Sequence, residues 1–243
     1  MRKATSPLPV ALVTGASQGL GAYLALELSR DGFAVLVHYR RRRDPALRLV
    51  KRIQTEGGQA HALGADLARA DEVDRCFSQI RKKWGRLDLL INNAGTYRPT
   101  ALLRTSPEDW RGGLESTATA TFHSIRAARP LFPRSGGRII NLGDSACERL
   151  TARKMAPGYH LGKIGVLLLT RSLAPELIRQ KITMNCISPG YLENSIQLPP
   201  SKSLPGGRPV SFGEVFAAVR YLISPEADQV TGTNLILSGG WNL

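Results

Sequence analysis

A short apolar run that leads straight into a glycine-rich turn constrains the fold more than any other feature of the chain. Residues 9–13 (PVALV) are apolar, and residues 14–21 (TGASQGLG) follow at once. Glycine lets the backbone turn sharply, and the amide N–H groups at the start of the next helix suit a pyrophosphate. That helix ends at Asp31-Gly32. The chain therefore opens with a strand, a glycine turn and a helix.

The alternation of strands and helices continues through the chain. Further strands are expected over 33–38, 59–65, 87–91, 137–142, 182–187 and 234–237, and helices over 45–56, 71–84, 106–131, 157–180 and 212–223. This order predicts a parallel sheet with helices on both faces. We expect an α/β fold: one Rossmann-type domain over 1–243 with a doubly wound parallel sheet of about seven strands. The Pro-, Gly- and Ser-rich segment 188–209 is expected to be a substrate loop.

Composition limits the classes of partner. The formal net charge is +14, but the basic residues are spread over most expected helices without an aromatic-interleaved stripe. We expect no dedicated nucleic-acid partner, although such a surface attracts phosphorylated cofactors. The cysteines Cys76, Cys147 and Cys186 are widely spaced and odd in number, which fits a reducing compartment without a metal site. Without a signal peptide pattern or an apolar run near ~18 residues, a cytoplasmic protein with no membrane partner is expected.

Four arginines follow the second expected strand. In dinucleotide-binding units an acid at this place usually binds the ribose 2′-hydroxyl, whereas arginine accommodates the 2′-phosphate of NADP. Here residues 40–43 are all arginine, and no acid occurs until Asp44. This favours NADP(H) over NAD(H), with Arg40 and Arg41 as the expected contacts. At least two of the four are interpreted as solvated charges at the start of the next helix.

Tyr159 and Lys163 are four residues apart in a segment expected to be helical. This spacing places both side chains on one helix face, so the ammonium can lie beside the phenol. A nearby cation favours the ionised phenol and lowers its pKa from about 10. The pair therefore predicts a tyrosine that exchanges protons with a carbonyl or an alcohol.

Six motifs in order resemble the short-chain dehydrogenase/reductase family over essentially the whole chain. They are TGASQGLG at 14–21, Asp66 after the third strand, NNAG at 92–95, Tyr159-x-x-x-Lys163, the run 188–190 (SPG) and SGGW at 238–241. The resemblance implies that Tyr159 is the proton donor. It also implies that Lys163 holds the nicotinamide ribose and lowers the Tyr159 pKa.

The resemblance also implies a cofactor site. The residues expected to contact the dinucleotide are Gly15, Ser17, Gln18, Gly19, Leu20, Gly21, Asp66, Leu67, Asn93, Ala94, Gly95, Pro189, Gly190, Leu192 and Asn194. Among them, the glycines form the loop, Asp66 and Leu67 flank the adenine, and residues 189–194 border the nicotinamide. An alternative interpretation makes NNAG mainly a tight structural turn.

The substrate-holding group departs from the family pattern. Many members carry a serine thirteen residues before the tyrosine, in a pattern like Asn-x-Ser-Ser. Counting back from Tyr159 reaches Ala146, whereas alignment on the preceding asparagine places Gly143 and Asp144 opposite the two serines. Asp144 is the first candidate and Ser145 the second.

An aspartate at this place has chemical consequences. Together with the run 38–40 (HYR), Asp144 is similar to pteridine reductases of the family, in which a carboxylate takes part in reducing a C=N bond. A protonated Asp144 can donate to a carbonyl, whereas an ionised one repels an oxyanion and suits a basic nitrogen heterocycle better.

The expected helix 106–131 contains two irregularities. Gly112 and Gly113 disfavour its first turns by about 1 kcal/mol each relative to alanine. Thr117 stands where the family resemblance implies an asparagine that supports a water chain to the lysine. A threonine hydroxyl has a different reach, so this proton relay is open to question.

The leading hypothesis is an NADPH-dependent reductase that transfers hydride to a carbonyl or a pterin-type C=N bond. The alternative substrate is a 3-oxoacyl thioester on an acidic carrier protein, which the basic surface would attract. The rival class is a non-catalytic, NADP-binding regulator. The resemblance also implies a homo-oligomer, typically a homotetramer.

Overall fold

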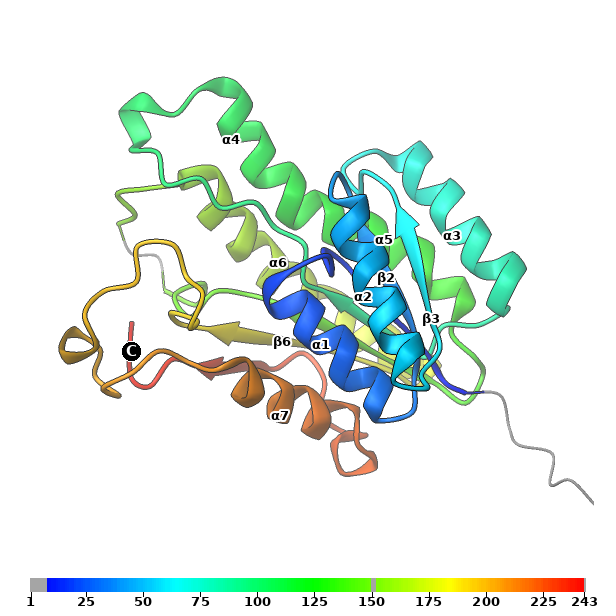
Figure 1. The fold of residues 1–243 in the computed structure, drawn as a ribbon. Coiled ribbons are helices and arrows are strands. Elements are labelled where there is room, and N and C mark those ends of the chain that lie inside the picture. The colour runs from blue at the N-terminus through cyan, green and yellow to red at the C-terminus, as the bar shows by residue number, and fades with distance from the viewer. Residues whose placement is uncertain (1–7, 150–151, 243) are drawn as a thin grey trace, which may run out of the picture.

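A seven-stranded parallel sheet forms the centre of the molecule (Figure 1). The computed structural model describes residues 8–149 and 152–242, so the part of the chain before residue 8, on which the expectation about a signal peptide depends, lies outside it. The strands are β1 (Val10–Val13), β2 (Ala34–Tyr39), β3 (Ala60–Gly64), β4 (Leu89–Asn92), β5 (Gly137–Leu142), β6 (Ile182–Pro189) and β7 (Asn234–Leu237). Their order, β3-β2-β1-β4-β5-β6-β7, confirms the predicted doubly wound sheet.

Helices cover both faces of this sheet (Figure 1). They are α1 (Gly19–Arg30), α2 (Arg43–Thr55), α3 (Ala70–Trp84), α4 (Pro107–Leu114), α5 (Ala120–Ala128), α6 (Pro157–Leu177) and α7 (Phe212–Ile223). The apolar residues of α1, α2 and α7 pack on one face, and those of α3, α5 and α6 pack on the other. None of the helices in the described parts of the chain is long and apolar enough to cross a membrane.

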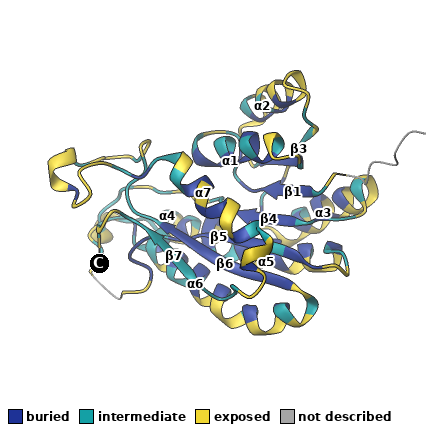
Figure 2. Cartoon of the chain, turned by 90° about the horizontal axis from the view of Figure 1, so that it is seen from below, coloured by how far each residue is buried: buried dark blue, intermediate teal, exposed yellow. Residues whose placement is uncertain are grey.

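The central strands are apolar on both sides. In β1, Ala11 and Val13 contribute to one core cluster, whereas Val10 and Leu12 contribute to the other. Successive side chains of a strand point to opposite faces, so a strand covered on both sides needs a continuous apolar run. Figure 2 shows the result, with buried strands between helices whose outer faces are exposed.

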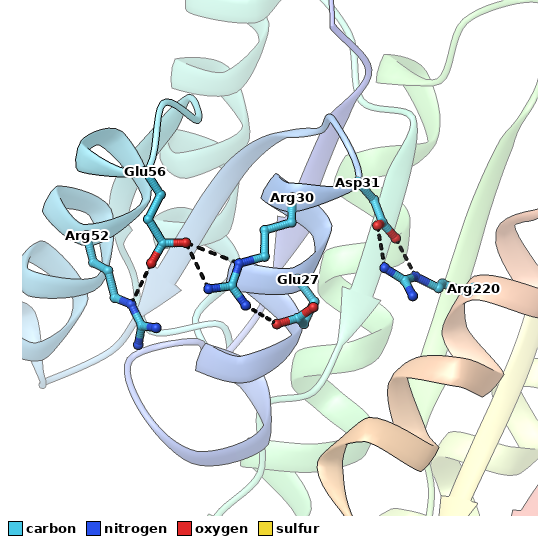
Figure 3. Close-up of polar contacts among 6 residues, drawn as sticks. All are labelled: Glu27, Arg30, Asp31, Arg52, Glu56 and Arg220. Atoms are coloured by element: carbon cyan, nitrogen blue, oxygen red, sulfur yellow. Dashed lines mark hydrogen bonds and ion pairs between the residues drawn. The ribbon is translucent and has the colours of Figure 1, made fainter.

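Surface ion pairs join the three helices of one layer (Figure 3). Arg30 of α1 donates to Glu56, just after α2, at 3.1 and 2.9 Å, and to Glu27 at 2.6 Å. Arg220 of α7 donates to both oxygens of Asp31 at 2.7 and 2.5 Å. Because exposed ion pairs are weak, the apolar contacts beneath them carry most of the packing energy.

The chain order places a ligand crevice beside β1. The connections from β1 to β3 progress in one direction across the sheet, and those from β4 to β7 progress in the other. Ligands of open parallel sheets bind at the carboxyl ends of the strands where this direction changes. The glycine turn after β1 and the NNAG segment after β4 meet at that point.

The segment expected to be a helix over 106–131 is helical from Pro107 to Leu131, but not all of its turns are α-helical. After α4 the chain forms a π-helical turn over Glu115–Thr119, then α5, then a 3₁₀ turn over Arg129–Leu131. In a π-helical turn, backbone hydrogen bonds join residues five apart instead of four. Within this segment the Thr117 hydroxyl donates to the carbonyl of Gly113 at 2.6 Å. The strand expected over 182–187 also extends further, because Ser188 and Pro189 pair with β7.

The backbones of α4 and α6 lie in direct contact, which accounts for most of the glycines in these helices. A Cβ atom at Gly113 would lie 2.5 Å from the Tyr159 amide nitrogen, and one at Gly158 would lie 2.3 Å from the Trp110 carbonyl oxygen. At Gly162 it would lie 1.8 Å from the Thr117 hydroxyl oxygen. Any side chain at these places would push apart the two helices that position Tyr159.

The adjacent glycines of α4 provide a matched test. A Cβ atom at Gly112 would meet nothing within 4 Å, unlike one at Gly113. Gly112→Ala is therefore expected to leave the free energy of unfolding unchanged or raise it by up to about 1 kcal/mol. Gly113→Ala is expected to lower it by about 1–3 kcal/mol through overpacking. Urea unfolding of both variants measures the difference, and equal values would contradict the assigned contact.

Candidate active site

Hydrogen bonds from the NNAG segment hold the glycine turn. The Thr14 hydroxyl accepts the amides of Asn93 and Ala94 at 2.9 and 3.0 Å. The Asn93 amide group donates to the carbonyls of Thr14 and Gly15 at 2.9 and 3.2 Å. A Cβ atom at Gly21 would lie 2.4 Å from this same amide nitrogen, so the contact requires glycine. The hydrogen bonds of Asn93 therefore agree with the interpretation of NNAG as a structural turn.

His38 holds the turn from its other side. The Gly15 amide donates to His38 Nδ1 at 3.1 Å, and Nε2 lies 3.0 Å from the Ala65 carbonyl. These partners assign the proton to Nε2. Burial lowers the His38 pKa to about 4, against the opposing effects of the Ala65 hydrogen bond and the Asp66 charge. A neutral histidine thus joins three segments, a role that the sequence analysis did not assign.

A cavity of about 200 Å³ lies over the turn. The predicted cofactor residues that line it are Gly15, Ser17, Gln18, Arg40, Arg41, Asp66, Leu67, Asn93, Ala94 and Gly95. Arg42 lines it as well, whereas Leu20 is 8% exposed and packs into the core. The N-cap residue of α1, Gln18, makes no side-chain cap bond, so the first amides of the helix remain available to an anion. These groups suit the phosphates of a dinucleotide.

A larger cavity of about 420 Å³ adjoins the carboxyl ends of β5 and β6. The predicted residues that line it are Asp144, Ser145, Tyr159, Pro189, Gly190 and Leu192. Residues that the sequence analysis missed are Tyr97, Arg153, Lys154, His160, Tyr191 and Trp241. Asn194 lies elsewhere, because a Cβ atom at Gly19 would lie 2.9 Å from its amide nitrogen. The 188–209 segment therefore reaches both this cavity and the glycine turn.

Tyr159 and Lys163 lie deep between the two cavities. A Cβ atom at Gly95, in the first cavity, would lie 3.4 Å from the Tyr159 ring and 3.9 Å from Lys163 Cε. The Lys163 ammonium donates to the Leu142 carbonyl at 2.5 Å and lies 5.5 Å from the Tyr159 ring centroid. Tyr97 packs edge-on against Tyr159, with ring centroids 5.3 Å apart.

The electrostatics of this pair differ from expectation. Burial raises the pKa of Tyr159, and the charges of Asp144 and Tyr97 raise it further. The net shift is opposite to the lowering expected from Lys163. Burial lowers the Lys163 pKa, while Cys186 and Asp144 partly oppose that shift. The phenol is therefore held in its protonated form.

Asp144 is surrounded by basic groups. Its Oδ1 accepts the Ala146 amide at 2.9 Å and lies 3.3 Å from Arg153 Nη2. Its Oδ2 lies 3.6 Å from His160 Nδ1, a buried atom without a hydrogen-bond partner among the described residues. Asp144 and Tyr159 line the same cavity, and the Asp144 charge contributes to the raised pKa of Tyr159. The Ser145 hydroxyl instead lies 3.4 Å from the amide of Asn242.

The Thr117 hydroxyl bonds within its own helical segment, and no bond to Tyr159 or Lys163 is found within the ranges that the structure describes. The hydroxyl donates to the carbonyl of Gly113 within its own helix. Its methyl carbon faces the site, since a Cβ atom at Gly95 would lie 3.5 Å from Thr117 Cγ2. In this arrangement the Thr117 side chain does not take the place of an asparagine side chain in a proton relay.

Comparisons with known proteins agree with this geometry. The family model described as short chain dehydrogenase matches residues 9–202. A 3-oxoacyl-[acyl-carrier-protein] reductase of Synechocystis sp. is 35% identical over 238 residues, covering 95% of this chain and 96% of the relative. A reductase of the same name from Staphylococcus aureus is 32% identical over 239 residues, with the same coverage.

Solved structures share the whole fold. A blue fluorescent protein from a metagenomic library, in complex with NADPH, has a TM-score of 0.89 and 29% identity, covering 97% of this chain and 98% of that one. A gluconate 5-dehydrogenase from Burkholderia cenocepacia, in complex with NADP and tartrate, has a TM-score of 0.87 and 29% identity, covering 96% and 94%.

The buried His38 predicts acid-sensitive stability. A histidine whose pKa is about 4 when folded and 6.5 when unfolded binds fewer protons in the folded state. Its contribution is complete above pH 6.5 and is lost as the pH falls towards 4, by about 3 kcal/mol. His38→Gln keeps a donor for Ala65 but does not titrate. Urea unfolding between pH 6.5 and 4 should show a flatter dependence in this variant, and parallel curves would exclude the assignment.

Proposed function

Because the chain belongs to the short chain dehydrogenase family and is an NAD(P)-dependent oxidoreductase, we propose that it reduces a C=O or C=N bond with NADPH. The observation that carries this proposal is the position of Tyr159 and Lys163 between a basic dinucleotide cavity and a cavity lined by Asp144. When bound, the cofactor supplies the hydride. The residues of this chain bind, orient and deliver the proton.

The proposed cofactor site uses backbone and arginine together. The first amides of α1 donate to the pyrophosphate, and the left-handed Gly15 and Gly19 shape the turn that lets it approach. Arg40, Arg41 and Arg42 surround the place for the 2′-phosphate. NADPH and NADP in the complexes of structurally similar proteins support this choice over NADH.

Tyr159 acts as the general acid in this proposal. Burial keeps its phenol protonated until a substrate oxygen or nitrogen gains negative charge or basicity during hydride transfer. The buried Lys163 ammonium then stabilises the phenolate that remains. The family and the reductase relatives support a catalyst rather than a non-catalytic, NADP-binding regulator.

Two substrate classes fit the larger cavity. The Asp144 carboxylate, oriented by Arg153 and facing His160, suits the N–H and basic nitrogen atoms of a pterin-type heterocycle. The names of the relatives instead support a 3-oxoacyl thioester on an acyl carrier protein, and a net charge of +14 would attract an acidic carrier. The carboxylate beside Tyr159 favours the heterocycle.

We further propose a cytoplasmic homo-oligomer, typically a homotetramer. Large apolar side chains are exposed on α4, α5 and α6, at Trp110, Phe122, Leu161 and Leu168. Large exposed apolar side chains on helices that lie together are typical of association sites. Sedimentation equilibrium gives the number of subunits, and a monomer at micromolar concentration would contradict this proposal.

Removal of the phenolic hydroxyl tests the proton donor. Tyr159→Phe is expected to lower kcat by about 100-fold or more, because no other donor replaces it. Tyr221→Phe is the control, since Tyr221 is exposed on α7. The decrease in NADPH absorbance in the presence of an active substrate measures both. A fully active Tyr159→Phe enzyme would exclude the role.

Arginine substitutions test the cofactor preference. Arg40→Ala and Arg41→Ala are each expected to raise the KM for NADPH about tenfold or more, and to leave that for NADH nearly unchanged. Arg43→Ala is the control, because Arg43 does not line the cavity. The preference is refuted if the KM values for both cofactors rise equally.

The two substrate classes predict different responses to the Asp144→Asn substitution and to salt. If a heterocyclic nitrogen binds Asp144, Asp144→Asn is expected to lower kcat/KM for a dihydropterin by about 30-fold or more, with little dependence on salt. If the substrate is carried by an acidic protein, rates fall steeply between low and high salt. Steady-state kinetics with both substrates at two ionic strengths distinguish them. Turnover of the thioester alone would exclude the heterocycle.

A further inference from the structure

Two buried cysteines form a polar cluster behind the wall of the substrate cavity. Cys147 follows Asp144 by three residues, and its amide donates to the Asp144 carbonyl at 2.9 Å. Cys186 lies in β6. The hydroxyl oxygen of Ser188 is 3.4 Å from the sulfur of Cys147 and 3.5 Å from that of Cys186. One hydroxyl group thus contacts both thiols.

One side-chain amide donates to the Cys147 sulfur. That of Asn234 lies 3.9 Å away, and the carbonyl of the same side chain accepts the Ser188 hydroxyl proton at 2.6 Å. Because this proton is used, the Ser188 hydroxyl accepts from the thiols. The hydrogen bond from Asn234 favours the Cys147 thiolate.

The cluster also contacts the groups that support the reaction. A Cβ atom at Gly143 would lie 2.2 Å from the Ser188 hydroxyl and 2.7 Å from the Cys186 sulfur. Lys163 donates to the carbonyl of the residue before Gly143. Its positive charge acts on both cysteines. The thiols therefore adjoin the segment that carries Asp144.

The three cysteines differ in their expected reactivity. The contact with Cys186 lowers the Cys147 pKa despite burial, whereas the same contact and burial raise the Cys186 pKa. Burial alone raises the pKa of Cys76 to about 11. Cys147 retains 6% exposure, and Cys186 has none. Cys147 is thus the nucleophile, Cys186 its partner, and Cys76 an internal control.

We propose that Cys147 and Cys186 are an oxidisable dithiol that reacts with hydrogen peroxide. The Cys147 thiolate attacks one peroxide oxygen, so that an S–O bond forms, the O–O bond breaks and the hydroxide released is protonated to water. Cys186 then attacks the sulfenic sulfur, and an S–S bond forms as the second water leaves. The two thiols lose two electrons in total, and the peroxide gains them.

The disulfide alters the substrate cavity, and its effect on activity rests on the proposed function. It ties the segment that carries Asp144 to β6 and removes the thiol contacts of Ser188, so the cavity wall beside Tyr159 moves. Activity falls on oxidation and returns when a dithiol reductant restores both cysteines. The chemical step itself does not depend on which substrate the enzyme reduces.

The test follows the cysteines directly, before any activity measurement. The full-length protein is treated with a small excess of hydrogen peroxide at pH 7, alkylated, digested and analysed by mass spectrometry. We expect a peptide pair joined through Cys147 and Cys186, formed at least about tenfold faster than any oxidation of Cys76. NADPH turnover is followed in parallel, before and after reduction.

Variants separate the two steps. Cys186→Ala is expected to stop at the sulfenic acid, which dimedone traps on Cys147, and Cys147→Ala is expected to leave Cys186 unmodified. Cys76→Ala should behave like the unmodified sequence. The proposal is overturned if Cys76 is oxidised as fast as Cys147, or if no joined peptide forms while all three thiols alkylate equally. Mass spectrometry detects the oxidised peptides whether or not the protein turns over a substrate. A failure of the proposed function therefore does not affect this result.

Discussion

The hydrogen bonds around Gly15 are the interaction on which the rest of the site depends. The turn needs a left-handed residue there, with φ +62°, and its amide is bound by His38. Asn93 binds its carbonyl from the opposite side. Without these bonds, buried backbone groups at the junction of β1, β2 and β4 would lack partners. The cofactor cavity is therefore shaped mainly by the need to give these backbone groups hydrogen-bond partners. The side chains that line the cavity have a smaller part in its shape.

The second constraint is the contact of α4 with α6, and it explains why the reactive tyrosine is rigid. Gly113 and Gly158 allow backbone contact, and the π-helical turn presents Thr117 to Gly162. Tyr159 is consequently fixed by its helix at one end and by Tyr97 at its ring. Such positioning is what a proton donor requires, since transfer depends steeply on distance.

Most of the fold was predictable because apolar runs and glycine turns determine it locally. The strand order and both helix layers follow from the alternation, and Tyr159 and Lys163 follow from helical spacing. The missed residues depend on tertiary contacts: His38 appears as one more residue of a buried strand, and His160 as a neighbour of Tyr159. The sign of the Tyr159 pKa shift also required burial, which sequence spacing does not report. The π turn was hidden because Thr117 is compatible with an ordinary helix.

Gly143 has a consequence for how related sequences can be interchanged. It stands opposite the first serine of the family pattern, but the space that a serine Cβ would need is filled by Ser188 and Cys186. A Gly143→Ser substitution alone would therefore create a clash with Ser188 and Cys186, and would not produce the serine site of the family pattern. Positions 143, 186 and 188 are therefore coupled: a larger residue at the first needs smaller side chains in β6, so the loop after β5 and the strand beside it can change only together.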